Sequence, residues 1–121
     1  MRRLPDTELE VMQAVWACDP PVTRAEIEQI LSVRHPMAQT TLLTFLSRLT
    51  EKGFLRTEKN GRISLYYPLI EKNEYAAVQS KQFVRQHFGE SISAFANALC
   101  SSGLTRNELE ELSALLEERV K

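Results

Sequence analysis

The sequence predicts a mainly α-helical protein with one small β-hairpin: a winged helix-turn-helix domain followed by a helical C-terminal part. Two observations support this fold class. Apolar residues recur at three- and four-residue spacing through most of the 121 residues, which is typical of amphipathic helices. Only around residues 54–67 does the pattern change to runs of aromatic and branched residues, and there the dipeptide Asn60-Gly61 is a strong hairpin signal.

The first two helices are predicted from their apolar stripes and their ends. Residues 6–18 place apolar side chains on one stripe as far as Trp16, and Pro20 then terminates the helix. The next helix begins with the sequence TRAE, a capping box in which the Thr23 hydroxyl and the Glu26 carboxylate bond reciprocally to exposed backbone N–H groups. The sequence thus predicts two consecutive amphipathic helices.

A third helix and a hairpin follow. The helix is expected over residues 39–52, and Gly53 supplies the left-handed residue that commonly ends a helix. Its buried stripe consists of Leu42, Phe45, Leu46 and Leu49. Strands are expected at residues 54–59 and 62–67, joined by a type I′ turn at Asn60-Gly61.

The C-terminal part is predicted to be helical throughout. A long helix over residues 71–88 is broken by Gly89, and a short amphipathic segment follows it. A last helix begins with a second capping box, which runs from Thr105 to Glu108. We therefore expect two domains, a DNA-binding domain over residues 1–70 and a helical dimerisation domain over residues 71–121.

Composition excludes several classes of protein. No apolar run approaches the roughly 20 residues that span a bilayer, and the N-terminus has no signal-peptide pattern, so we expect a cytoplasmic protein without a membrane partner. Cys18 and Cys100 lack metal-ligand spacing, which predicts neither a metal site nor a disulfide framework. His35 and His87 are isolated from any nucleophile. No enzyme activity and no cofactor are therefore expected.

The charges are unevenly distributed along the chain. The net charge is −1, yet residues 34–62 hold six basic and two acidic residues and residues 69–121 hold six basic and eight acidic residues. A local basic patch of this kind is a modest electrostatic footprint of nucleic-acid binding.

Three helices followed by a hairpin is the element order of a winged helix-turn-helix. Such a third helix can enter the major groove, while the hairpin reaches a neighbouring phosphate strand or the minor groove. The residues expected to face bases are Thr40, Thr41, Leu43, Thr44 and Ser47. Those expected to contact phosphates are Arg48, Lys52, Arg56, Lys59 and Arg62.

Three alternatives remain open at the level of sequence. A small domain of this composition can also be a protein-interaction module that does not bind DNA. Leu43 is equally consistent with a partly buried position at the edge of the core. The C-terminal apolar stripes can pack on a second copy or back on the N-terminal domain.

Several segments together resemble the penicillinase and methicillin-resistance repressors of bacteria, the BlaI/MecI family. They are LPDTELEVMQAVW, VTRAEIEQIL, TTLLTFLSRLTEKGFLRTEKNGRISLYYPLI and LTRNELEELSALL. The resemblance implies a homodimeric transcriptional repressor on a palindromic operator. The C-terminal residues then expected to mediate dimerisation are Tyr75, Val78, Ile92, Phe95, Leu99, Leu109, Leu112 and Leu116.

The resemblance also implies a proteolytic switch and exposes three departures. A sensor-activated protease cleaves the best-known members at an Asn-Phe bond, and the matching bond here is Asn97-Ala98, where alanine replaces phenylalanine. Relatives tend to have Lys or Arg near the position of Leu43, so we expect a different operator sequence or affinity. The chain also lacks the C-terminal cysteine cluster of a copper-responsive branch.

Overall fold

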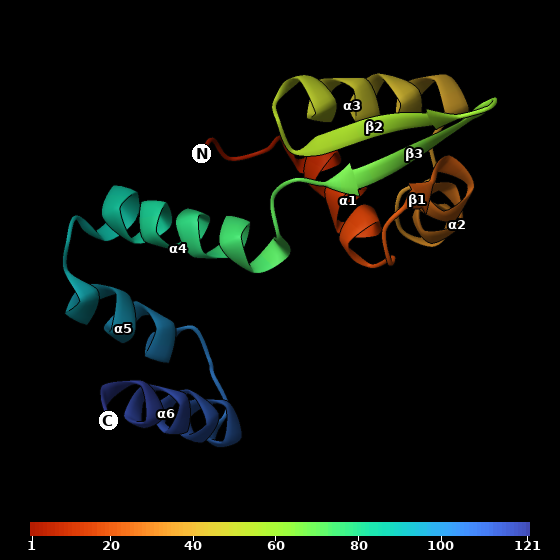
Figure 1. Cartoon of the computed structure of the whole chain (residues 1–121). Helices are drawn as coiled ribbons and strands as arrows, with labels where there is room; N and C mark the ends of the chain where they lie inside the picture. Colours follow the sequence, from red (N-terminus) through yellow and green to blue (C-terminus); the bar gives the residue numbers. More distant parts are fainter. The chain divides into compact units, whose positions relative to one another are not determined.

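The computed structural model describes residues 1–121, and the chain divides into two compact units, Met1–Gln79 and Ser80–Lys121 (Figure 1). The first unit holds helices α1 (Asp6–Trp16), α2 (Arg24–Arg34) and α3 (Gln39–Glu51) and strands β1 (Val22–Thr23), β2 (Leu55–Asn60) and β3 (Ile63–Pro68). The second unit holds helices α5 (Ile92–Ser101) and α6 (Arg106–Val120). Helix α4 (Lys72–Phe88) begins in the first unit and continues into the second. The predicted fold class, mainly helical with a small hairpin, is confirmed.

The sheet has one strand more than the predicted hairpin. Its order is β1-β3-β2, with both pairs antiparallel, and Val22 of β1 lies opposite Tyr66 of β3. Strand β1 is only two residues long, which is too short to produce an alternating sequence pattern. Its pairing ties the N-terminus of α2 to the hairpin.

The prediction of a type I′ turn at Asn60-Gly61 is wrong. Asn60 pairs with Ile63, so the two central residues are Gly61 and Arg62. Gly61 has a φ of +66°, and no residue other than glycine has a positive φ. A type I′ turn requires positive φ at both central residues, whereas positive φ at the first alone, occupied by glycine, is the signature of a type II′ turn. The pairing of the strands therefore places the turn at Gly61-Arg62, one residue later than the Asn60-Gly61 dipeptide predicted.

The helix ends agree with the sequence signals. Thr23 and Glu26 form both hydrogen bonds of the capping box at the start of α2. At the end of α3, Gly53 has a φ of +83°, the Phe54 N–H donates to the Leu49 carbonyl at 2.9 Å, and the Gly53 N–H donates to the Thr50 carbonyl at 3.1 Å. This is a Schellman motif. It reverses the chain so that β2 starts beside α3, as Figure 1 shows.

The core of the first unit includes a residue that the sequence analysis assigned elsewhere. Tyr75, expected to mediate dimerisation, is only 5% exposed, and its hydroxyl accepts a 2.8 Å hydrogen bond from the Leu4 N–H. Its ring lies 5.9 Å from that of Trp16 and 5.7 Å from that of Phe54, measured between centroids. The assignment of Tyr75 to dimerisation is therefore corrected, because the first turn of α4 packs against the N-terminal segment and α1.

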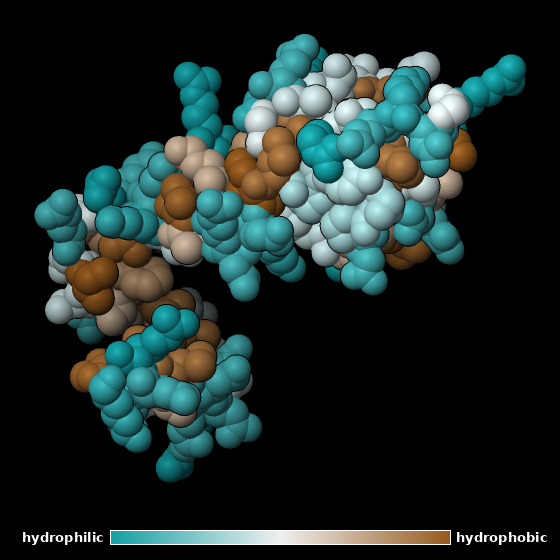
Figure 2. Space-filling model, in the orientation of Figure 1, coloured by the Kyte–Doolittle hydropathy of each residue, from teal (hydrophilic) through white to brown (hydrophobic).

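The second unit has no buried residue at all. Phe83, Phe88 and Phe95 lie within 6.5 Å of one another, measured between ring centroids. Several large aliphatic side chains stay more than half exposed, namely Ile92, Leu115, Leu116 and Val120. The brown surface of these helices in Figure 2 corresponds to such residues. None of the helices has the length and apolar character needed to cross a membrane.

Candidate nucleic-acid interface

The exposed face of α3 has the polar character expected from the sequence. Leu42, Leu46 and Leu49 are buried, at 1% exposure or less, and fix the rotation of the helix. That rotation leaves the opposite face open to solvent. All the predicted base-facing residues lie on it and are exposed: Thr40, Thr41, Leu43, Thr44 and Ser47.

The hydroxyl of Thr44 is restricted in what it can offer a ligand. It donates a 3.0 Å hydrogen bond to the Thr40 carbonyl one turn earlier. A hydroxyl has one proton, so only the lone pairs of the Thr44 oxygen remain available. In a major groove these lone pairs fit the amino groups of adenine or cytosine, which are the donors on the base edges.

A pair of threonines joins α3 to the hairpin. Thr50 donates to the Leu46 carbonyl at 2.8 Å, so the 3.1 Å contact between the Thr50 and Thr57 hydroxyls has Thr57 as its donor. The hydrogen bond holds the first half of β2 against the last turn of α3. The orientation of the hairpin relative to the helix is therefore fixed by a direct side-chain contact.

A groove of about 410 Å³ lies between the start of α2 and the hairpin, and one residue of α3 contributes to its lining. Leu43 contributes from α3, Lys59 from β2 and Arg62 from the hairpin turn itself. The other lining residues are Thr23, Arg24, Ala25, Ile63, Ser64 and Tyr66. Figure 1 shows the tip of the hairpin at the same end of the unit as the N-terminal half of α3. The structure thus brings together Leu43, Lys59 and Arg62, three of the predicted residues.

Arg48 also lies on the exposed face of α3, at the C-terminal half of the helix. Its guanidinium carbon is 5.7 Å from the centroid of the Phe45 ring, a cation–π distance. Phe45 is half-buried and packs against the core. The ring therefore supports the arginine on the helix surface without neutralising its charge.

Besides Arg48, two more of the predicted phosphate contacts lie outside this groove. Lys52 donates a 2.6 Å hydrogen bond to the buried carboxylate of Glu8 on α1. Arg56 stacks on Tyr67, with 4.1 Å between the guanidinium carbon and the ring centroid, and pairs with Glu58. Because side chains alternate along a strand and Thr57 faces α3, Arg56 lies on the opposite face of the hairpin.

The sequence did not predict six of the groove residues, and Arg24 and Ile63 are two of them. Arg24 lies at the start of α2 and pairs with Glu28 at 3.3 Å, and Ile63, at the hairpin tip, is 56% exposed. Arg24 is brought to the hairpin by the pairing of β1 with β3, which leaves no local sequence signal. The exposed isoleucine beside a glycine turn was a signal that could have been noticed.

Comparisons with known proteins place the chain in a family. Residues 4–118 match the family model described as penicillinase repressor. The chain is 32% identical to the penicillinase repressor of Bacillus licheniformis over 122 residues, which cover 98% of this chain and 94% of the relative. It is 29% identical to the methicillin resistance regulatory protein MecI of Staphylococcus aureus strain N315 over 113 residues, covering 93% and 91%.

Two solved structures are also similar. The solution structure of the monomeric form of Bacillus licheniformis BlaI in complex with the blaP half-operator has a TM-score of 0.51 and 34% identity, covering 61% of this chain and 89% of that one. The solution structure of the DNA-binding domain of the repressor BlaI has a TM-score of 0.52 and 33% identity, covering 62% and 94%.

Proposed function

The chain belongs to the penicillinase repressor family, and from this premise we propose that it is a transcriptional repressor that binds double-stranded operator DNA. The observation that supports this most directly is the exposed, hydroxyl-rich face of α3 together with the groove that Leu43 shares with Arg24, Lys59 and Arg62. In this role α3 enters the major groove, and the hairpin contacts the adjacent backbone. Occupation of the promoter then excludes polymerase sterically.

We assign the phosphate contacts to the cations that line the groove or lie on the exposed face of α3. These are Arg24, Arg48, Lys59 and Arg62. Thr40, Thr41, Leu43, Thr44 and Ser47 face the bases. Six to eight phosphate contacts in a dimer predict that the logarithm of affinity falls with the logarithm of salt concentration with a slope between about −5 and −7.

A gel-shift titration across salt concentrations tests DNA binding. The probe is the double-stranded sequence that the full-length chain selects from a random library. A steep linear decline of affinity with salt is the expected result. Failure to select any sequence, with retained binding of a protein partner, would favour the alternative of a protein-interaction module.

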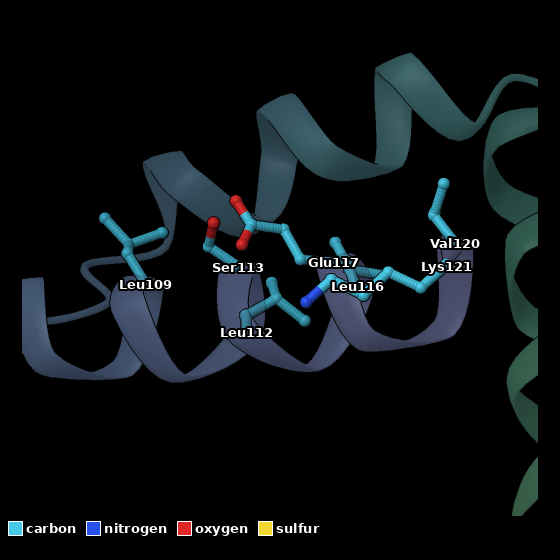
Figure 3. A pocket seen from close by; sticks show the side chains of 7 residues that line it. All are labelled: Leu109, Leu112, Ser113, Leu116, Glu117, Val120 and Lys121. Atoms are coloured by element: carbon cyan, nitrogen blue, oxygen red, sulfur yellow. The ribbon is translucent and has the colours of Figure 1, made fainter.

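The repressor acts as a homodimer through its second unit and the adjoining turn of α4 that holds Val78. Helices without a single buried residue are marginally stable by themselves and need a partner surface. Helix α6 has an apolar groove along Leu109, Leu112, Leu116 and Val120 (Figure 3). With Tyr75 now in the core, the residues proposed for dimerisation are Val78, Ile92, Phe95, Leu99, Leu109, Leu112 and Leu116. A two-fold dimer predicts a palindromic operator.

Sedimentation of the full chain and of residues 1–79 tests the dimer. The shorter fragment keeps the whole core of the first unit, Tyr75 included. We expect a dimer for the full chain and a folded monomer with weaker DNA binding for the fragment. A dimeric fragment would place the interface elsewhere.

Proteolysis at Asn97-Ala98 is the proposed route of inactivation. Both residues are exposed, yet they lie inside α5, where the Ser101 hydroxyl donates to the Asn97 carbonyl at 3.0 Å. A protease must therefore open the helix locally before cleavage. Alanine also offers a specificity pocket much less apolar area than phenylalanine.

Co-expression with an activated sensor protease tests this route. Ala98→Phe is expected to increase cleavage, and Ala96→Phe, which places the same ring two residues earlier, is the matched control. An intact wild-type chain together with an intact Ala98→Phe variant would contradict the proposal.

A further inference from the structure

Leu43 is an unusual residue for the surface that it occupies. It is 40% exposed, and it is the only large aliphatic or aromatic side chain of α3 that is classed as exposed. Its exposed neighbours one turn away on the helix, Thr40 and Ser47, carry hydroxyl groups. An exposed leucine is common by itself, so exposure alone implies nothing. Its position within the groove is what distinguishes it.

The groove around Leu43 is lined by three cations and also by apolar side chains, among them the exposed Ile63 of the hairpin. Arg24, Lys59 and Arg62 line the same cavity from the other two elements. When these cations contact phosphates and α3 enters the major groove, Leu43 is placed to reach base edges. Leu43 can neither donate nor accept a hydrogen bond, so its contribution there depends on apolar contact.

We propose that Leu43 recognises the C5 methyl group of a thymine in the operator. This inference rests on the proposed DNA binding and adds the chemistry of one base contact. The thymine methyl is the only apolar group that a base pair presents in the major groove. Uracil has the same hydrogen-bonding groups without the methyl, and 5-methylcytosine has the methyl on a different base pair. The inference therefore predicts a preference for a methyl group at one position.

Thymine-to-uracil replacement tests the contact without altering the protein. The probes are the duplex selected by the full-length chain and versions in which uracil replaces thymine at single positions. We expect uracil to weaken wild-type binding by about fourfold at one position of each half-site, the effect of losing one buried methyl contact.

Two variants assign the effect to Leu43. Leu43→Ala is expected to bind the thymine and uracil duplexes equally, because the side chain that contacts the methyl is gone. Val33→Ala is the matched control, since Val33 is an 87% exposed aliphatic residue on α2 outside the groove. It is expected to retain the full wild-type discrimination. Circular dichroism confirms that both variants are folded.

Three outcomes separate the possible failures. Equal binding of all thymine and uracil duplexes by the wild type overturns the inference while leaving DNA binding intact. A uracil penalty that persists undiminished in Leu43→Ala assigns the methyl contact to another residue and also overturns it. Failure to select any duplex overturns the proposed function itself, and with it this contact.

Discussion

The Lys52 ammonium donates a 2.6 Å hydrogen bond to Oε2 of Glu8, linking the end of α3 to the first turn of α1. Glu8 is only 2% exposed, and its second oxygen, Oε1, has no hydrogen-bond partner. Lys52 is 43% exposed at its side chain. The lysine therefore compensates a buried carboxylate, which is a structural role rather than the phosphate contact expected from the sequence.

Replacement of this lysine should lower stability. In Lys52→Met the Glu8 carboxylate stays buried without its counter-charge, so we expect the free energy of unfolding to fall by about 3 kcal/mol. Urea unfolding measures the difference. The double variant Glu8→Leu/Lys52→Met removes both charges and should recover most of the loss. Lys59→Met, at an exposed lysine of the hairpin, is the control and should change stability by less than about 0.5 kcal/mol.

The two cations of β2 should differ in their effect on DNA binding. Lys59 lines the groove, whereas Arg56 lies on the other face of the hairpin with Glu58 and Tyr67. We expect Lys59→Ala to weaken binding and to reduce the salt slope by about one per protomer. Arg56→Ala should leave both nearly unchanged. A loss in Arg56→Ala that equals or exceeds the loss in Lys59→Ala would contradict this assignment, because the face of the hairpin that carries Arg56 would then also contact DNA.

The boundary of the DNA-binding domain can be measured with two fragments. Residues 1–79 retain Tyr75, and residues 1–70 lack it. Without Tyr75 the Leu4 N–H loses its acceptor and the Trp16 and Phe54 rings lose a contact. We expect the longer fragment to be more stable by about 3 kcal/mol or more, in line with the cost of removing a large buried aromatic side chain. Equal melting temperatures would support a boundary at residue 70.

The two cysteines should react at different rates. Burial raises the pKa of the Cys18 thiol, and the nearby carboxylates of Glu26 and Asp19 raise it further. A raised pKa lowers the thiolate fraction at a given pH, and the thiolate is the nucleophile. Cys18 is also half-buried, while Cys100 is exposed. Iodoacetamide at pH 7.5 should modify Cys100 first, as peptide mass spectrometry would show. Preferential labelling of Cys18 would contradict this ordering.

Local sequence signals were sufficient to predict most of the helices and strands of the first unit. The capping box at Thr23 and the glycine terminator at Gly53 marked helix ends correctly, because these interactions involve residues only a few positions apart. The exposed face of α3 followed from its apolar stripe for the same reason. The type of the hairpin turn was not predicted correctly, since it depends on strand register and not on the dipeptide alone.

The sequence by itself determined the order of the elements, the buried face of each helix and the family to which the chain belongs. The tertiary structure alone decided which cations line the groove and where Tyr75 lies. The physical reason is that these features depend on distant contacts. Glu8 and Lys52 are 44 residues apart, and Leu4 and Tyr75 are 71 apart. No periodic pattern records such pairs, because they form only when the elements pack together.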